Sequence, residues 1–82
     1  MPSPKSTPSY GDRTYKLIEI VGLSEESIAQ AVRNGVGRAG ETLKGLDWLE
    51  VTEIRGRIKE GKVTFQVKMK IGFPVMRGEE MA

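Results

Sequence analysis

The amino-acid sequence predicts an α+β fold in the order β-α-β-β, with one helix covering one face of a three-stranded antiparallel sheet. Two periodicities support this class. Apolar and polar residues alternate along residues 63–75, which is typical of a half-buried strand. Apolar residues spaced at i, i+3, i+4 and i+7 run through residues 28–43, which is typical of an amphipathic helix. Two further segments with strand composition complete the order.

The first strand is predicted over residues 14–21 (TYKLIEIV), because they are rich in β-branched and aromatic residues, and it is expected to end at Gly22. Ser24 is the predicted N-cap of the helix. Residues 25–26 are both Glu and would lie in the first turn, where the helix dipole favours negative charge.

The helix is predicted to run to about Lys44, with Gly45 as the residue that follows its C-terminus. Gly35, Gly37 and Gly40 lie inside this span, and each costs helix stability by about 1 kcal/mol relative to Ala. Their presence predicts that a neighbouring backbone approaches closely, in the same chain or across a subunit contact. The apolar stripe consists of Ile28, Ala31, Val32, Gly35, Val36, Ala39 and Leu43.

The second strand is predicted over residues 46–58. Within it, Leu49 and Val51 occupy odd-numbered positions. The apolar residues that follow, Ile54 and Ile58, occupy even-numbered positions. Because a strand keeps one face apolar by strict alternation, this change predicts a β-bulge or strong bend near residues 52–53.

The third strand follows a hairpin turn at residues 59–62 (KEGK), in which Gly61 supplies a positive φ. Its apolar positions alternate without a break: Val63, Phe65, Val67, Met69, Ile71, Phe73 and Val75.

Composition sets the ends of the folded domain. Residues 1–12 hold three of the four prolines and three serines, and they cannot bury enough apolar surface to offset their ordering entropy. We therefore expect residues 1–12 to be a disordered tail, residues 13–75 to be the domain and residues 76–82 to be a second flexible tail.

Composition also excludes several chemistries. The 82 residues contain no Cys and no His, which excludes disulfides, zinc sites built on those ligands, and Ser-His-Asp or thiol catalysis, and no metal site is predicted. The net charge is +2 and charges of both signs alternate along the chain, so charge does not indicate a nucleic-acid partner. Because small domains without disulfides or structural metals often depend on association for stability, we expect a homo-oligomer.

No apolar run approaches the length of a transmembrane helix, and residues 1–12 lack the apolar stretch of a signal peptide. The sequence therefore predicts a cytoplasmic protein.

Trp48 is the single tryptophan of the chain, within the run LDWLEV at the start of the second strand. An indole among acids and alternating aliphatic residues is either a core or interface anchor or an aromatic platform for a planar ligand. The residues by themselves leave both interpretations open, and the anchor is the more common one.

Six stretches between residues 14 and 73 share their order and spacing with a known family. They are YKLIEIVG (15–22), SEES (24–27), RAGETL (38–43), LDWLEV (46–51), IRG (54–56) and FQVKMKIGF (65–73). Through them the chain resembles the dodecins, a family of small flavin-binding proteins. No single stretch is a sharp motif, but their order and spacing along the chain are specific.

The resemblance implies a β-α-β-β subunit whose sheet wraps partly around its helix, and an assembly of such subunits into a hollow homododecamer. It also implies flavins held in pairs at two-fold contacts, where a tryptophan from each of two subunits stacks on the isoalloxazine rings. Members of the family store or sequester flavins and quench their excited states, and they are not known as enzymes.

On this chain, the resemblance assigns the stacking role to Trp48 and a hydrogen bond to the polar edge of the ring to Gln66, whose amide both donates and accepts. Arg55 would hold the phosphate of FMN. Related bacterial chains carry an arginine where this chain has Pro74, so riboflavin and lumichrome are alternatives to FMN. The implied cofactor-binding residues are Trp48, Gln66, Arg55, Asp47, Lys16 and Arg57.

Some members of the family also bind coenzyme A where three subunits meet, through basic residues late in the helix. Arg38, Thr42 and Lys44 match those positions loosely. The resemblance therefore implies a second ligand site at this end of the helix.

Two other function classes follow from the residues. A small oligomeric nucleic-acid- or protein-binding module would use a sheet face with Trp48, Lys68 and Lys70, but the near-neutral charge and the lack of an aromatic pair count against nucleic acid. An enzyme is not expected, because the sequence offers no acid-base or nucleophilic group of residues.

Overall fold

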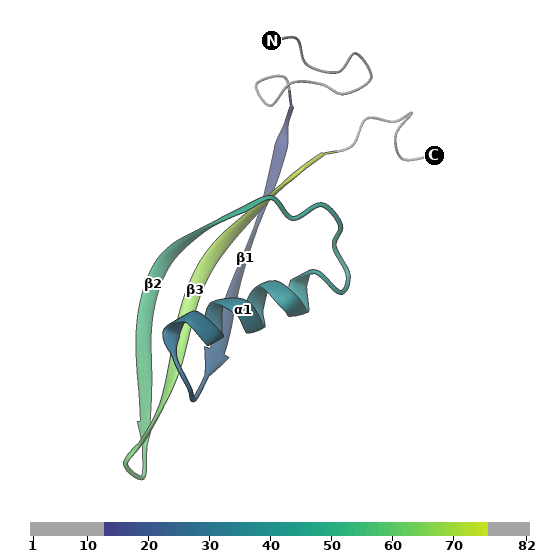
Figure 1. Cartoon of the computed structure of the whole chain (residues 1–82). Coiled ribbons are helices and arrows are strands. Elements are labelled where there is room, and N and C mark those ends of the chain that lie inside the picture. Colours follow the sequence, from purple (N-terminus) through teal and green to yellow (C-terminus); the bar gives the residue numbers. More distant parts are fainter. Residues whose placement is uncertain (1–12, 76–82) are drawn as a thin grey trace, which may run out of the picture.

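The computed structural model describes residues 13–75. Its elements are β1 (Tyr15–Ser24), α1 (Ile28–Ala39), β2 (Trp48–Lys59) and β3 (Lys62–Pro74) (Figure 1). Within the described residues, the strands form one antiparallel sheet in the order β1-β3-β2. The predicted β-α-β-β fold is therefore confirmed. The two predicted tails lie outside the described residues.

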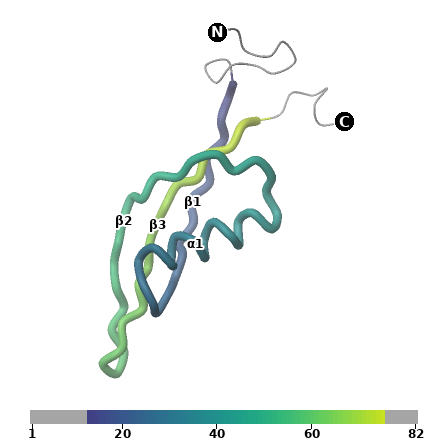
Figure 2. The backbone as a smooth tube through the Cα atoms, in the orientation of Figure 1, coloured from purple at the N-terminus to yellow at the C-terminus, as the bar shows by residue number. Residues whose placement is uncertain are grey.

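The core lies between α1 and the central strand β3. The helix packs on β1 and β3, and β2 lies at the edge of the sheet on the far side of β3 from β1 (Figure 2). Val67, Met69 and Ile71 of β3 are fully buried and meet Ala31 of α1, which confirms the predicted alternation in the middle of the strand. Partly buried apolar residues surround this centre: Ile18, Ile20, Val32, Val36, Ala39 and Leu46.

The first strand does not end at Gly22 as predicted but continues to Ser24. Gly22 pairs with Val67 inside the ladder. A Cβ atom on Gly22 would lie 2.0 Å from the carbonyl oxygen of Ala31 in α1, and a Cβ atom on Gly35 would lie 3.4 Å from the Cα of Gly22. The glycine therefore allows the helix to approach the strand, and tertiary packing outweighs its low strand propensity.

The prediction that Ser24 is the N-cap was wrong, because the helix begins later. Ser27 is the N-cap, and its Oγ accepts a 2.9 Å hydrogen bond from the N–H of Gln30. Ser24 Oγ instead accepts from the N–H of Glu26 at 2.9 Å, within the turn that precedes the helix. Two serines three residues apart have the same capping chemistry, so the sequence did not distinguish them. As a result, residues 25–26 lie before the helix and not in its first turn.

The helix also ends earlier than Lys44. Its last residue is Ala39, and Gly40 caps it with an N–H that donates to the carbonyl of Val36 at 2.9 Å. Gly45 has a φ of +74°, but it lies in the following loop and is not the helix C′ residue. The predicted close approach of a backbone holds at Gly35, whereas the space around Gly37 is open within the described chain.

The hairpin between β2 and β3 forms where it was predicted. Glu60 and Gly61 have φ values of +53° and +78°, so both central residues of the two-residue loop are left-handed. This combination is typical of the type I′ turn, whose twist matches that of the flanking strands.

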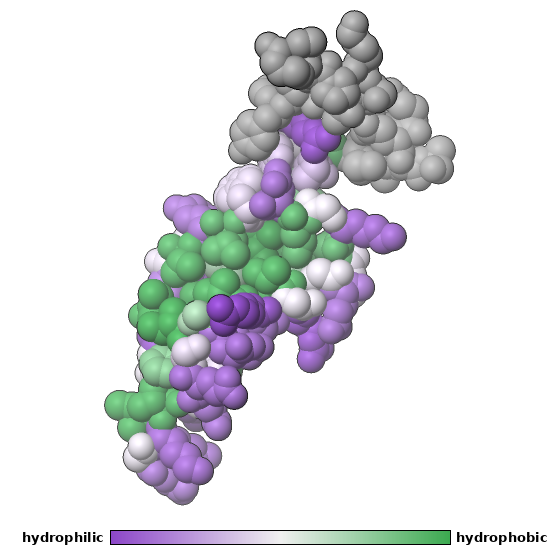
Figure 3. All heavy atoms as spheres, viewed as in Figure 1, coloured by the Kyte–Doolittle hydropathy of each residue, from purple (hydrophilic) through white to green (hydrophobic). Residues whose placement is uncertain are grey.

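Strand β2 is exposed along its whole length, because α1 does not cover it. Hydrophobic surface continues along this strand on the side that the helix occupies (Figure 3). Five of the exposed apolar side chains lie on the helix side of the β2–β3 hairpin: Leu49, Val51, Ile54, Ile58 and Val63.

Candidate functional site

The face of the sheet that points away from α1 carries four of the six predicted cofactor-binding residues, and we call it the outer face. Cross-strand partners share a face, so the ladder shows which residues lie together. Trp48 of β2 lies opposite Gly72 of β3, Arg55 lies opposite Gln66, and Arg57 lies opposite Thr64. These positions alternate with the buried residues of β3 and therefore belong to the outer face.

A β-bulge in β2 puts Trp48 and Arg55 on the same face. The register shifts between Val51 and Glu53, as the sequence predicted, and the hydroxyl of the extra residue, Thr52, donates to the carbonyl of Lys68 at 3.2 Å. Without the shift, an even-numbered and an odd-numbered residue of the strand would point to opposite faces. The bulge is thus required for the arrangement that the family resemblance implies, in which Trp48 and Arg55 lie on one face of the sheet.

The indole of Trp48 lies on the outer face above Gly72. A Cβ atom on Gly72 would lie 2.4 Å from Cε2, 2.5 Å from Cζ2 and 2.8 Å from Nε1 of the indole. The Trp48 side chain nevertheless stays 36% exposed, and it is not a member of the buried core. Trp48 is therefore not a core anchor of the single chain, and its free surface is available to a ligand or another subunit.

Tyr15 was not predicted as a site residue, yet it contacts two of the predicted ones. Its hydroxyl donates a hydrogen bond to the carboxylate of Asp47. Its ring centroid lies 6.3 Å from that of Trp48, with the planes tilted by 33°. The N–H of Asp47 in turn donates to the carbonyl of Gly72 at 2.9 Å. Only the pairing of the strands reveals this group, because Tyr15 and Asp47 lie far apart in sequence.

Gln66 and Arg55 form a second part of the outer face. Gln66 is partly buried between its neighbours, Arg55 on β2 and Leu23 on β1. The Nη2 atom of Arg55 lies 3.0 Å from Oε1 of Glu53, in an ion pair whose side chains are 62% and 44% exposed. Glu53 was not predicted as a site residue, and its carboxylate lies next to the Arg55 guanidinium.

Trp48 and Gln66 of one chain are far apart. Gln66 precedes Gly72, the partner of Trp48, by six positions on β3. At roughly 3.3 Å per residue, this places them roughly 20 Å apart along the strand. That separation of the two backbone positions is longer than a tricyclic flavin ring.

Lys16 lies apart from the other predicted cofactor-binding residues. It pairs with Phe73, and this pair belongs to the face on which the helix lies. Arg57 does lie on the outer face, but two pairs beyond Arg55 toward the hairpin. The fold therefore places Asp47 and Trp48 at one end of the outer face, with Gln66, Arg55 and Arg57 farther along it.

Two of the three residues predicted for a second ligand line one pocket. Arg38 in the last turn of α1 and Thr42 in the turn that follows lie beside a pocket of about 330 Å³ between the helix and β1. Its other lining residues are mainly apolar, including Ile18, Ile20 and Leu43. Lys44 is not among the lining residues.

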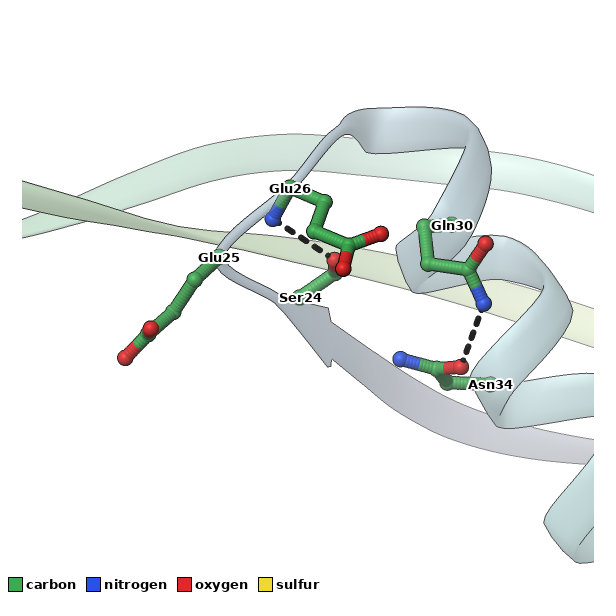
Figure 4. A pocket seen from close by; sticks show the side chains of 5 residues that line it. All are labelled: Ser24, Glu25, Glu26, Gln30 and Asn34. Carbon is green, nitrogen blue, oxygen red and sulfur yellow. Dashed lines mark hydrogen bonds between the residues drawn. The ribbon is translucent and has the colours of Figure 1, made fainter.

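A more polar pocket of about 350 Å³ lies where β1 turns into α1 (Figure 4). Its polar side chains bond mainly to the protein itself: Gln30 donates to Asn34 Oδ1 at 2.8 Å, and Asn34 donates to the carbonyl of Leu23 at 2.9 Å. Across residues 13–75, no three His, Cys, Asp or Glu side chains form a group that could hold a metal ion.

No helix within the described part of the chain is both long and apolar enough to cross a membrane.

The model of one protein family, the dodecins, matches residues 14–76. The chain belongs to the dodecin family. A dodecin of Thermus thermophilus is 47% identical over 62 residues, which are 74% of this chain and 90% of the relative.

Solved dodecin structures share the fold described above. The dodecin from Streptomyces davaonensis is 46% identical with a TM-score of 0.77, and the match covers 80% of this chain and 98% of that one. The dodecin from Streptomyces coelicolor is 47% identical with a TM-score of 0.77, with 82% and 97% covered. The resemblance drawn from the sequence is therefore confirmed.

Proposed function

We propose that this chain is a flavin-binding storage or sequestration protein of the cytoplasm. The observation that carries the proposal is the indole of Trp48, which lies on the outer face of the sheet above Gly72 and keeps 36% of its surface exposed. An exposed indole on a rigid strand is a platform for a planar aromatic ligand. Membership of the dodecin family makes a flavin the ligand of choice.

The site is completed by a second copy of the chain. Because Trp48 and Gln66 of one chain lie roughly 20 Å apart along β3, the ring that stacks on Trp48 meets Gln66 of a different copy. A two-fold contact between outer faces gives two such sites at once. Two flavins, each stacked on one tryptophan, then lie between the two sheets. Contact with the indole quenches the emission of the bound flavins by electron transfer.

The same copies assemble into a closed shell, which we expect to be a homododecamer. Within residues 13–75 the fully buried apolar side chains are only Ala31, Val67, Met69 and Ile71. So small a core gives little stability by itself, because hydrophobic stabilisation follows the apolar area removed from water. The uncovered apolar row of β2 supplies the missing burial when another copy covers it.

FMN is the proposed ligand, with riboflavin and lumichrome as alternatives. Arg55 lies on the outer face opposite Gln66, and its guanidinium suits a phosphate because it donates in a planar fork. Two features weaken this preference. Arg55 already pairs with Glu53, and the position that carries a second arginine in related bacterial chains is Pro74 here.

Catalysis is not part of the proposal. Beside the indole, the acidic group is Asp47, whose carboxylate already accepts a hydrogen bond from Tyr15. The chain has no His or Cys to act as a base or nucleophile. Binding, shielding and quenching of the flavin need neither.

A second ligand is favoured by the pocket at the end of α1. Arg38 and Thr42 line it together with apolar side chains, a combination that suits a ligand with a phosphate and an apolar arm. Coenzyme A has both. We therefore propose coenzyme A as a second, weaker ligand, with Lys44 outside the pocket of the single chain.

Fluorescence titration of the apo-protein with FMN, riboflavin and lumichrome tests the proposed function. Loss of flavin emission on binding, saturating at one flavin per chain, supports it. Unchanged emission with all three ligands contradicts it. A labelled single-stranded oligonucleotide serves as the comparison, because salt-sensitive binding to it would instead indicate a nucleic-acid-binding module. On the outer face, Glu19, Glu50 and Glu53 lie opposite Lys68 and Lys70, so acidic and basic charges are mixed and do not form the basic patch that nucleic acid binds.

A further inference from the structure

We propose that Gly72 and Tyr15 are positioning residues that hold the Trp48 indole face-down on β3, with its opposite face free for a planar ligand. This inference rests on the proposed function and deepens it. Gly72 and Tyr15 do not themselves touch the ligand, but they set the orientation of Trp48, which does.

The distances around Gly72 show which part of the indole meets the sheet. The hypothetical Cβ atom is nearest to Cε2, at 2.4 Å, and slightly farther from Cζ2 and Nε1, at 2.5 and 2.8 Å. Cε2 is bonded to both of the other atoms. A group approaching in the plane of the ring would reach Cζ2 and Nε1 before Cε2, so Gly72 lies under the face of the indole and not beside its rim.

Gly72 is therefore the residue that makes this orientation possible. Any side chain at this position would occupy the volume that the indole fills, since all three indole atoms lie closer than the 3.0 Å that non-bonded heavy atoms keep from a Cβ atom. Gly72 is itself buried although it points to the outer face, because the indole covers it. The backbone of β3 thus forms a flat floor for one face of Trp48.

Tyr15 of β1 contacts both the indole and the residue before it. Its ring lies 6.3 Å from that of Trp48, and its hydroxyl binds the carboxylate of Asp47, the residue before the indole. The Asp47 N–H binds the carbonyl of Gly72. The start of β2 is thus tied to both β1 and β3 at the position of the tryptophan, where a strand end would otherwise fray.

Fixing the indole before the ligand arrives favours binding, because less rotational freedom is lost when the ring is sandwiched. Gly72 and Tyr15 would therefore raise affinity for the ring system itself and act equally on FMN, riboflavin and lumichrome. This separates them from Arg55, whose effect depends on the phosphate.

The test compares Gly72→Ala and Tyr15→Phe with the wild-type protein. Gly37→Ala is the matched control, because open space surrounds Gly37. The first readout needs no flavin: near-UV circular dichroism and acrylamide quenching of the apo-protein report how the single tryptophan is held. We expect both variants to lose tryptophan dichroism and to gain acrylamide access, and the control to match the wild type.

The second readout is the dissociation constant for riboflavin, which has the ring but no phosphate. Tyr15→Phe keeps the aromatic ring and removes one hydroxyl, so we expect affinity to fall by roughly two- to tenfold. Gly72→Ala should cost at least as much, with the oligomer unchanged by light scattering. If Gly72→Ala fails to assemble, Tyr15→Phe decides the question.

Wild-type dichroism and quenching in Tyr15→Phe, or wild-type riboflavin affinity in that variant, would overturn the positioning role. The two hypotheses fail in different ways. A wild-type protein that binds no flavin contradicts the proposed function, whereas the apo-protein spectra still report whether Gly72 and Tyr15 hold the indole.

Discussion

Glu53 and Arg55 form an ion pair on the outer face of β2, with Oε1 and Nη2 3.0 Å apart. Both point outward because the bulge at Thr52 reverses the parity of the strand. The residue proposed to bind phosphate is therefore already next to a negative charge. A surface pair of this exposure is worth at most about 1 kcal/mol, so a phosphate can compete for the guanidinium, but at a reduced affinity.

Replacing Glu53 by Gln should strengthen FMN binding. The substitution removes the competing carboxylate and its repulsion of the phosphate, so we expect affinity for FMN to rise by up to about fivefold, corresponding to about 1 kcal/mol. Riboflavin affinity should stay unchanged, which makes it the internal control. Parallel fluorescence titrations measure both. A weaker affinity for FMN would mean that Glu53 orients Arg55 for the ligand and does not compete with it.

Replacing Arg55 by Ala should weaken FMN binding more than riboflavin binding, because only FMN presents a phosphate. A charge-assisted hydrogen bond contributes about 1.5–3 kcal/mol when desolvated and less at an exposed site. The ratio of the two dissociation constants is the quantity to measure. Arg33→Ala is the matched control, since Arg33 is an exposed arginine of α1, which lies on the opposite side of the sheet from the outer face. Equal losses for both ligands would show that Arg55 does not contact the phosphate.

Replacing Trp48 by Ala should abolish most flavin binding and leave the fold intact. A buried tryptophan would cost about 3–5 kcal/mol of folding stability on truncation, but Trp48 is 36% exposed and lies outside the core. Light scattering and a thermal melt of the variant, beside its riboflavin titration, measure the two effects separately. A variant that unfolds or dissociates while the wild-type protein ignores flavin would make Trp48 an interface anchor.

Replacing Gly22 by Ala should destabilise the chain strongly. The added methyl group would lie 2.0 Å from the backbone oxygen of Ala31, which no side-chain rotation can relieve. Overpacking of this kind typically costs about 1–3 kcal/mol, and here the helix must move as a whole. Urea unfolding measures the loss. Gly37→Ala should instead stabilise the helix by up to about 1 kcal/mol. Equal stability of the two variants would show that α1 does not lie this close to β1.

Replacing Ile54 by Lys should break the assembly. Ile54 is 52% exposed in the single chain, so a lysine there costs little unless another copy covers it. We expect light scattering to show smaller species than the wild type. Ala29→Lys is the control, because it adds the same charge at an exposed position of α1 outside the apolar stripe. An unchanged oligomer for Ile54→Lys would mean that this row of β2 stays uncovered.

Local pattern in the sequence was enough to predict the order of the elements, the hairpin and the bulge. The alternation along residues 63–75 and the parity change near Thr52 depend only on which way successive side chains point. Gly61 could be assigned to the turn because the turn needs a residue with positive φ, which glycine adopts readily. Each of these features is settled within a few residues of chain. The family resemblance, carried by ordered stretches along the chain, was likewise visible without the fold.

The tertiary structure alone decided which residues meet. Gly22 looked like a strand end until α1 was placed against it, and Ser24 was indistinguishable from Ser27 as a cap. The contact of Tyr15 with Asp47 and the separation of Trp48 from Gln66 both depend on the register of β1 and β2 against β3. Register is set by packing between segments distant in sequence, because shifting a strand by one residue exchanges its two faces. No local pattern contains that information.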